Sequence, residues 1–110
     1  MAKRKNPRFT NGIPELLILK LLSEKEMYGY QIARAIMEET RRTLQFGEGC
    51  IYPLLRSLKK RKLLTSRRQD VDGRTRLYYA LSPRGRARLR EMSSDWERVS
   101  SGVRLVLNGA

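Results

Sequence analysis

The last quarter of the chain carries the pattern that most restricts how it can fold. Ser82-Pro83 is a strong helix start, because serine caps a first turn and proline fits the first helical position. The helix that begins there is expected to run to about Leu107. Its apolar residues recur at alternating steps of three and four: Leu89, Met92, Trp96, Val99, Val103 and Val106. This spacing is an a/d heptad seam, so we predict a dimerisation helix within residues 83–110.

A second copy of the chain is the simplest partner for this seam, since twofold dimers are the commonest oligomers. The alternative is that the helix folds back on its own domain. A first helix predicted over residues 11–22 has almost no polar face and must be covered on most sides. We expect its Leu16 to join the dimer interface. Asn11 or Thr10 is the expected cap of that helix, with Pro14 in its first turn.

Two more helices are predicted between residues 29 and 62. After a turn at residues 23–26, residues 29–39 carry one buried stripe, made of Ile32, Ala33, Ile36 and Met37. Residues 50–62 carry another, made of Ile51, Leu54, Leu55 and Leu58, opposite a polar and basic side. Pro53 would remove a backbone hydrogen bond and bend this third helix if it began near Gly47. If the helix begins at Cys50, Pro53 falls harmlessly in the first turn.

Two alternating segments, residues 64–69 and 75–81, predict a pair of strands. Residues 70–73 lie between them, and Asp72-Gly73 is the signal for a tight hairpin turn. The arginines at both ends of this loop would reach DNA phosphates or an adjacent minor groove: Arg67, Arg68, Arg74 and Arg76. The predicted fold is therefore mainly α with a small β-hairpin.

The charge of the chain points to a polyanionic partner. Lysine and arginine number 24 against 11 acidic residues, which gives a net charge of +13. There is no histidine and a single cysteine, Cys50, so the commonest general base and a thiolate metal site within one chain are both missing. No apolar run is long enough to span a membrane. We expect a cytoplasmic protein that is not an enzyme and needs no metal or cofactor.

Residues 11–82 have the order of a winged helix-turn-helix, in which the last short helix enters the major groove of DNA. Residues 1–10 form a basic arm that either contacts phosphates or is a solvated tail. The candidate DNA-binding residues lie in this arm, in the helices and in the hairpin: Lys3, Arg4, Lys5, Tyr30, Glu48, Gly49, Cys50, Tyr52, Arg56, Lys59, Lys60, Arg74 and Arg76. The main alternative is an RNA-binding or ribosome-associated protein, and a basic module for a protein or membrane surface is another.

Three segments resemble the PadR family of bacterial transcriptional regulators. They are LLSEKEMYGYQI at residues 21–32, IYPLLRSL at residues 51–58 with Leu63 and Leu64, and DGRTRLYYALSPRG at residues 72–85. Their order and spacing match the family's second helix, recognition helix and wing, and the resemblance runs from about Ile13 to Leu107. It is closest to the smaller subfamily, which has a single short C-terminal helix.

The resemblance implies a homodimeric winged helix-turn-helix repressor that binds a pseudo-palindromic operator in double-stranded DNA. In some similar proteins a tryptophan of the C-terminal helix sandwiches a flat ligand with its twin across the dimer. Trp96 stands at the matching place. A small aromatic or drug-like effector would then bind at Trp96 with Met92 and Val99, whereas the alternative is that Trp96 is an ordinary residue of the dimer seam.

Overall fold

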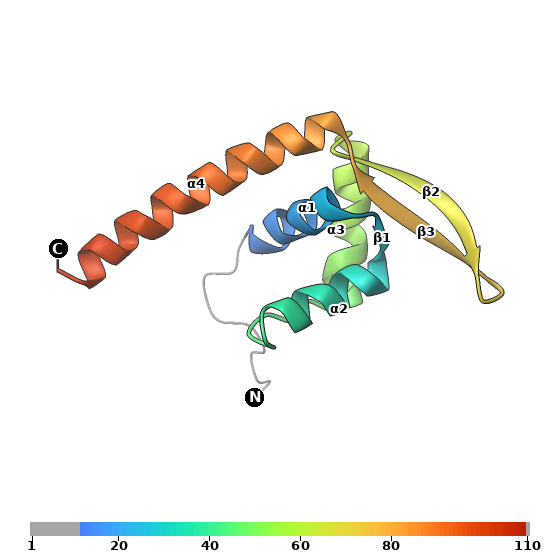
Figure 1. Ribbon diagram of the computed structural model, residues 1–110, viewed down its shortest axis with the longest axis horizontal. Coiled ribbons are helices and arrows are strands. Elements are labelled where there is room, and N and C mark those ends of the chain that lie inside the picture. The colour runs from blue at the N-terminus through green and yellow to red at the C-terminus, as the bar shows by residue number, and fades with distance from the viewer. Residues whose placement is uncertain (1–11, 110) are drawn as a thin grey trace.

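Helices on one side and a twisted antiparallel sheet on the other make up residues 12–109, which this computed structural model describes (Figure 1). The elements follow in the order α1 (Ile13–Glu24), β1 (Met27–Tyr28), α2 (Gly29–Glu39), α3 (Glu48–Lys60), β2 (Leu64–Val71), β3 (Arg74–Leu81) and α4 (Pro83–Leu107). The β2–β3 hairpin projects from the cluster of α1, α2 and α3 in one direction, and α4 runs away from it in the other. This order confirms the predicted mainly helical fold with its hairpin and long last helix.

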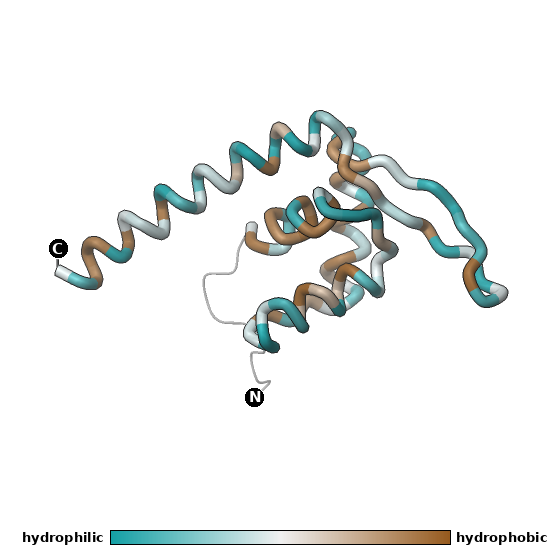
Figure 2. The backbone as a smooth tube through the Cα atoms, in the orientation of Figure 1, coloured by the Kyte–Doolittle hydropathy of each residue, from teal (hydrophilic) through white to brown (hydrophobic). Residues whose placement is uncertain are grey.

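The core lies where α1, α2 and α3 meet the base of the sheet. The largest fully buried side chains come from those three helices: Ile18, Leu19, Ile32, Ile36, Ile51, Leu55 and Leu58. Both predicted stripes supply members of this set, although Leu54, Ala33 and Met37 are only partly buried. Figure 2 shows apolar residues gathered along α1, whereas the outer part of the hairpin is largely hydrophilic. Each fully buried aliphatic side chain contributes roughly 1.5–3 kcal/mol.

The predicted cap of the first helix was wrong. The N-cap is Gly12, with φ 81°, and α1 begins at Ile13 with Pro14 in its first turn as expected. A left-handed φ is easily reached by glycine because it has no Cβ. Thr10 and Asn11 lie outside the described residues.

Of the two predicted starts of α3, near Gly47 or at Cys50, the structure has the earlier one. Its N-cap is Gly47, whose carbonyl accepts from the amides of Cys50 and Ile51, so Pro53 lies inside the helix and cannot donate a backbone bond. The helix ends at Lys60 rather than Lys62, which has a left-handed φ of 65°. The α3 bounds therefore shift towards the N-terminus, while its buried stripe is unchanged.

The sheet has three strands in the order β1-β3-β2, one more than predicted. β2 and β3 pair from Leu64 with Leu81 to Val71 with Arg74. Asp72 and Gly73 both have positive φ, 50° and 76°, as a type I′ turn requires. β1 was missed because two residues are too few to show an alternating pattern.

Ser82 joins the end of the sheet to α4 and to the end of α3. Its Oγ accepts from the amide of Gly85 at 3.0 Å and donates to the carbonyl of Lys62 at 2.8 Å. Its own amide donates to the carbonyl of Leu63 at 3.1 Å. Gly85 is buried there, and a Cβ would lie only 2.1 Å from the Leu63 oxygen. The predicted Ser82 cap is confirmed, and it fixes where α4 leaves the domain.

The seam of α4 divides into two parts. Leu89 and Met92 pack against the core of their own domain, so the fold-back alternative holds for the first turns of the helix. Beyond them the seam is open to solvent, with exposed fractions of 47% at Trp96, 59% at Val99, 50% at Val103 and 82% at Val106.

Candidate nucleic-acid interface

α3 presents a basic face next to its anchored apolar stripe. Arg56, Lys59 and Lys60 are exposed, and the two lysines lie in the last turn, where positive charge suits the helix dipole. Glu48, Gly49 and Cys50 form the exposed first turn of the same helix. With Tyr52, the structure therefore brings seven of the predicted site residues onto one helix, whose buried side holds it against the domain.

Tyr52 is oriented by a glycine that the sequence analysis did not single out as a site residue. The Tyr52 ring lies directly against the first residue of α2, Gly29, where a Cβ would be 2.2 Å from the ring carbon Cε1. Any larger residue at this position must displace the ring. Gly29 lies in the segment at residues 21–32 that resembles the family, but the need for glycine at this position comes from a contact between α2 and α3.

A groove of about 330 Å³ separates α3 from β3. It is lined by Tyr28, Gly29, Tyr52, Arg56, Thr75, Arg76, Leu77 and Tyr79. Arg56 and Arg76 bring positive charge from two elements, and this lining contains no carboxylate. Burial raises the pKa of Tyr79 above its ordinary value of 10.0. The groove is thus a concave surface of positive charge and hydroxyl groups.

Arg76 has a buried donor without a protein acceptor. Its guanidinium lies 4.7 Å from the centre of the Tyr28 ring, and its Nε has no hydrogen-bond partner within residues 12–109. An unpaired buried donor costs about 1–3 kcal/mol. The Tyr28 ring offers the guanidinium a cation–π contact but no strong acceptor, so the Nε–H stays unpaired.

Arg67 pairs with a carboxylate of its own chain although its side chain is 49% exposed, and its contact with DNA stays a prediction. Its Nε donates to both carboxylate oxygens of Glu26 at 3.0 Å, and its guanidinium lies 5.1 Å from the centre of the Tyr78 ring. The hydrogen bond from Arg67 holds the pKa of Glu26 below its usual value. Arg68 is exposed, and so is Arg74 at the hairpin turn.

Tyr30 is not among the residues that line the groove. Tyr30 is 51% exposed on α2, and its hydroxyl accepts from Arg34 at 3.2 Å. Lys3, Arg4 and Lys5 lie outside the described residues. Within residues 12–109 no helix is long and apolar enough to cross a membrane, and no three metal-ligating side chains gather.

The open part of α4 carries a shallow apolar groove of about 450 Å³. Arg98, Val99, Gly102, Val103, Val106 and Leu107 line it. Of the three predicted ligand-binding residues only Val99 belongs to this lining; Met92 is partly buried against the domain core, and Trp96 is exposed one turn before the groove.

Comparisons with known proteins agree with this geometry. The transcriptional regulator PadR-like family model matches residues 18–91. Transcriptional regulator Rv3488 of Mycobacterium tuberculosis is 33% identical over 101 residues, which cover 92% of this chain and 89% of that protein. A PadR-like transcriptional regulator from Bacillus cereus has a TM-score of 0.80 at 30% identity, covering 94% of this chain and all (100%) of that chain.

A PadR family transcription regulator from Clostridium difficile has a TM-score of 0.77 at 28% identity, covering 87% of this chain and 99% of that chain. The matched residues 18–91 run from α1 into α4 and include α3 and the β2–β3 hairpin. This chain therefore belongs to the PadR-like family of transcriptional regulators.

Proposed function

We propose that the protein is a homodimeric repressor that binds a pseudo-palindromic operator in double-stranded DNA. The observation that carries this proposal is the carboxylate-free groove between α3 and β3, whose lining includes Arg56 and Arg76 and which lies beside the exposed basic side of α3. A major groove admits an α-helix, and phosphates on its rim need donors on both sides of that helix. Repression rather than activation follows from the family resemblance.

The proposal assigns different contacts to different parts of this surface. The first turn of α3, Glu48 to Cys50, reads base edges, since the N-terminal residues of a recognition helix lie deepest in the groove. Tyr52, Arg56 and Arg76, which all line the groove, bind phosphates of the DNA backbone. Lys59 and Lys60 add positive charge along the DNA backbone. Arg74 at the hairpin turn reaches the neighbouring minor groove.

The second chain covers the open seam of α4. Large apolar side chains exposed together on one helix mark an interaction surface, and the heptad spacing suits a second copy of the same helix. Residues 96–106 are the part of α4 that the domain itself leaves uncovered. Leu16, which is half-buried at the start of α1, extends this interface towards the domain.

A small aromatic effector binds in the dimer beside Trp96 and releases the operator. Two copies of this half-exposed ring, with Met92 and Val99 as apolar walls, would make a site for a flat ligand between the chains. Quenching of Trp96 fluorescence by flat aromatic compounds, together with loss of DNA binding at the same concentrations, tests this part of the proposal.

The DNA-binding surface is tested by comparing Arg56→Ala with Arg90→Ala. Both substitutions remove one positive charge, but Arg90 is an exposed residue of α4 away from the groove. We expect Arg56→Ala to weaken duplex binding at least about tenfold and to reduce the salt slope by about two, because each chain of the dimer loses one phosphate contact. Arg90→Ala should change both quantities little. Equal effects of the two variants would show that only net charge matters and would contradict the proposed surface.

A further inference from the structure

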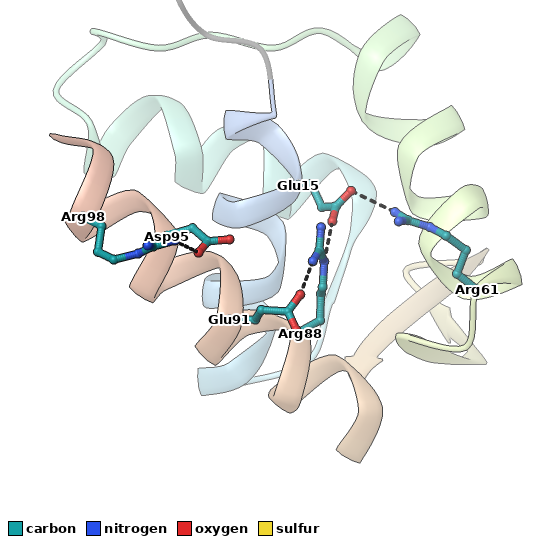
Figure 3. Close-up of polar contacts among 6 residues, drawn as sticks. All are labelled: Glu15, Arg61, Arg88, Glu91, Asp95 and Arg98. Carbon is teal, nitrogen blue, oxygen red and sulfur yellow. Dashed lines mark hydrogen bonds and ion pairs between the residues drawn. The ribbon is translucent and has the colours of Figure 1, made fainter. Parts of the chain in front are cut away.

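One half-buried carboxylate connects three helices that have different tasks in the proposed dimer. Glu15 lies in the first turn of α1 and is only 16% exposed. It accepts from Arg61 Nη2 at 2.8 Å and from Arg88 Nε at 3.4 Å. Arg61 is the C-cap of α3, and Arg88 lies in the second turn of α4 (Figure 3). The carboxylate therefore stands between the end of the recognition helix and the base of the dimerisation helix.

This contact fixes the direction of α4 at a second point. The first point is Ser82, which ties the start of α4 to the carbonyls of Lys62 and Leu63 just after α3. A helix held at one end can still pivot, whereas a second contact further along sets its angle. Arg88 supplies that second contact through Glu15, and Leu89 packs against the core beside it.

We infer that Glu15 is a positioning residue that sets the spacing of the two DNA half-sites, an inference that rests on the proposed homodimeric DNA binding. In such a dimer the open part of α4 joins the chains, and the angle between α4 and α3 decides how far apart the two recognition helices lie. Glu15 is bonded to both sides of that angle.

The part of α4 beyond Arg88 is long enough for a small tilt to move its far end by about the spacing of one base pair. From Arg88 to Val99 the helix rises by about 16 Å, at about 1.5 Å per residue. A tilt of about 10° at Arg88 therefore moves Val99 by about 3 Å relative to α3. Successive base pairs lie about 3.4 Å apart. A small loss of angular restraint thus changes which half-site spacing fits.

The test is selection of bound sites from a duplex library in which two half-sites are separated by a variable number of base pairs. The wild-type chain is compared with Glu15→Gln and Arg88→Gln, both of which remove the ion pair between α1 and α4. Glu91→Gln is the matched control. Glu91 also pairs with Arg88, but it lies one turn further along the same helix, α4. That variant removes an ion pair to Arg88 without removing the bridge between helices.

We expect wild type and Glu91→Gln to select one narrow spacing. Glu15→Gln and Arg88→Gln should accept neighbouring spacings, with the preference for the best one reduced about threefold, the range expected for losing one partly exposed ion pair. Binding to a single isolated half-site should stay unchanged. Arg88→Gln keeps the pair between Glu15 and Arg61, so it reports on the same contact even if Glu15→Gln is less well folded.

Two results would overturn the inference while leaving the proposed function intact. One is an unchanged, narrow spacing preference in both variants. The other is an equal loss of affinity for paired and single half-sites, which would mean that Glu15 only stabilises the fold. If the wild-type chain retained no duplex at all, the proposed function itself would fail together with this inference.

Discussion

Ser82→Ala is the substitution whose effect on stability follows most directly from the structure. Ser82 is 8% exposed, and its hydroxyl makes two hydrogen bonds, one from the Gly85 amide and one to the Lys62 carbonyl. Alanine removes both and adds no new contact. The change therefore isolates the junction that holds the start of α4 against the end of α3.

The expected cost combines two terms. Loss of a serine N-cap costs about 1 kcal/mol. Loss of the bond to the Lys62 carbonyl costs about another 1 kcal/mol, because that acceptor lies beside a buried residue. The total of about 2 kcal/mol is a large share of the roughly 5–15 kcal/mol that stabilises a domain of this size. It corresponds to a fall in Tm of about 8–16 °C.

Thermal unfolding followed by circular dichroism at 222 nm measures this change. Because a dimer's Tm depends on concentration, all variants are compared at one protein concentration. Ser93→Ala is the control, since Ser93 is an exposed serine within α4 and alanine suits a helix interior. A Tm for Ser82→Ala within a few degrees of both wild type and Ser93→Ala would refute the reasoning about this junction.

Further predictions concern the groove, the sheet and the seam. Gly29→Ala should destabilise the fold by about 1–3 kcal/mol in urea unfolding and weaken duplex binding, because the new Cβ displaces the Tyr52 ring; unchanged values for both would contradict this contact. Glu26→Gln should lower Tm at pH 7. Arg67 depresses the folded-state pKa of Glu26, so the ion pair between them stabilises the fold only while the Glu26 carboxylate is ionised. That difference from wild type should shrink as pH falls below 4.5 through the lowered pKa, and a pH-independent difference would argue against the ion pair. Val103→Asp should raise the dimer dissociation constant at least about a hundredfold in sedimentation analysis, since it places a charge in the proposed seam, and an unchanged mass would exclude that seam.

Local patterns in the sequence were enough to predict most of the helices and strands. The α2 helix runs over residues 29–39 as predicted from its stripe, and Asp72-Gly73 and Ser82 occupy the turn and cap expected of them. Each of these features depends on neighbours within a few residues. The β1 strand was missed because its pairing with β3 joins residues about fifty positions apart and leaves no local periodicity.

The candidate site was less predictable, because its geometry depends on contacts between distant segments. The basic face of α3 was visible as a pattern, and Arg56 and Arg76 were both expected to be site residues. That Arg67 is tied to Glu26 while Arg76 keeps a buried unpaired donor could not be read from spacing, since all the hairpin arginines look alike in the sequence. The bridge through Glu15 likewise joins three helices that no local pattern connects.

The most direct test of the account is a titration of the purified chain on the duplex upstream of its own gene, with random duplex and tRNA as competitors. Retention of that duplex against both competitors, at two chains per site, is the predicted result. Preferential loss of the protein to tRNA would contradict the account and favour an RNA-binding role.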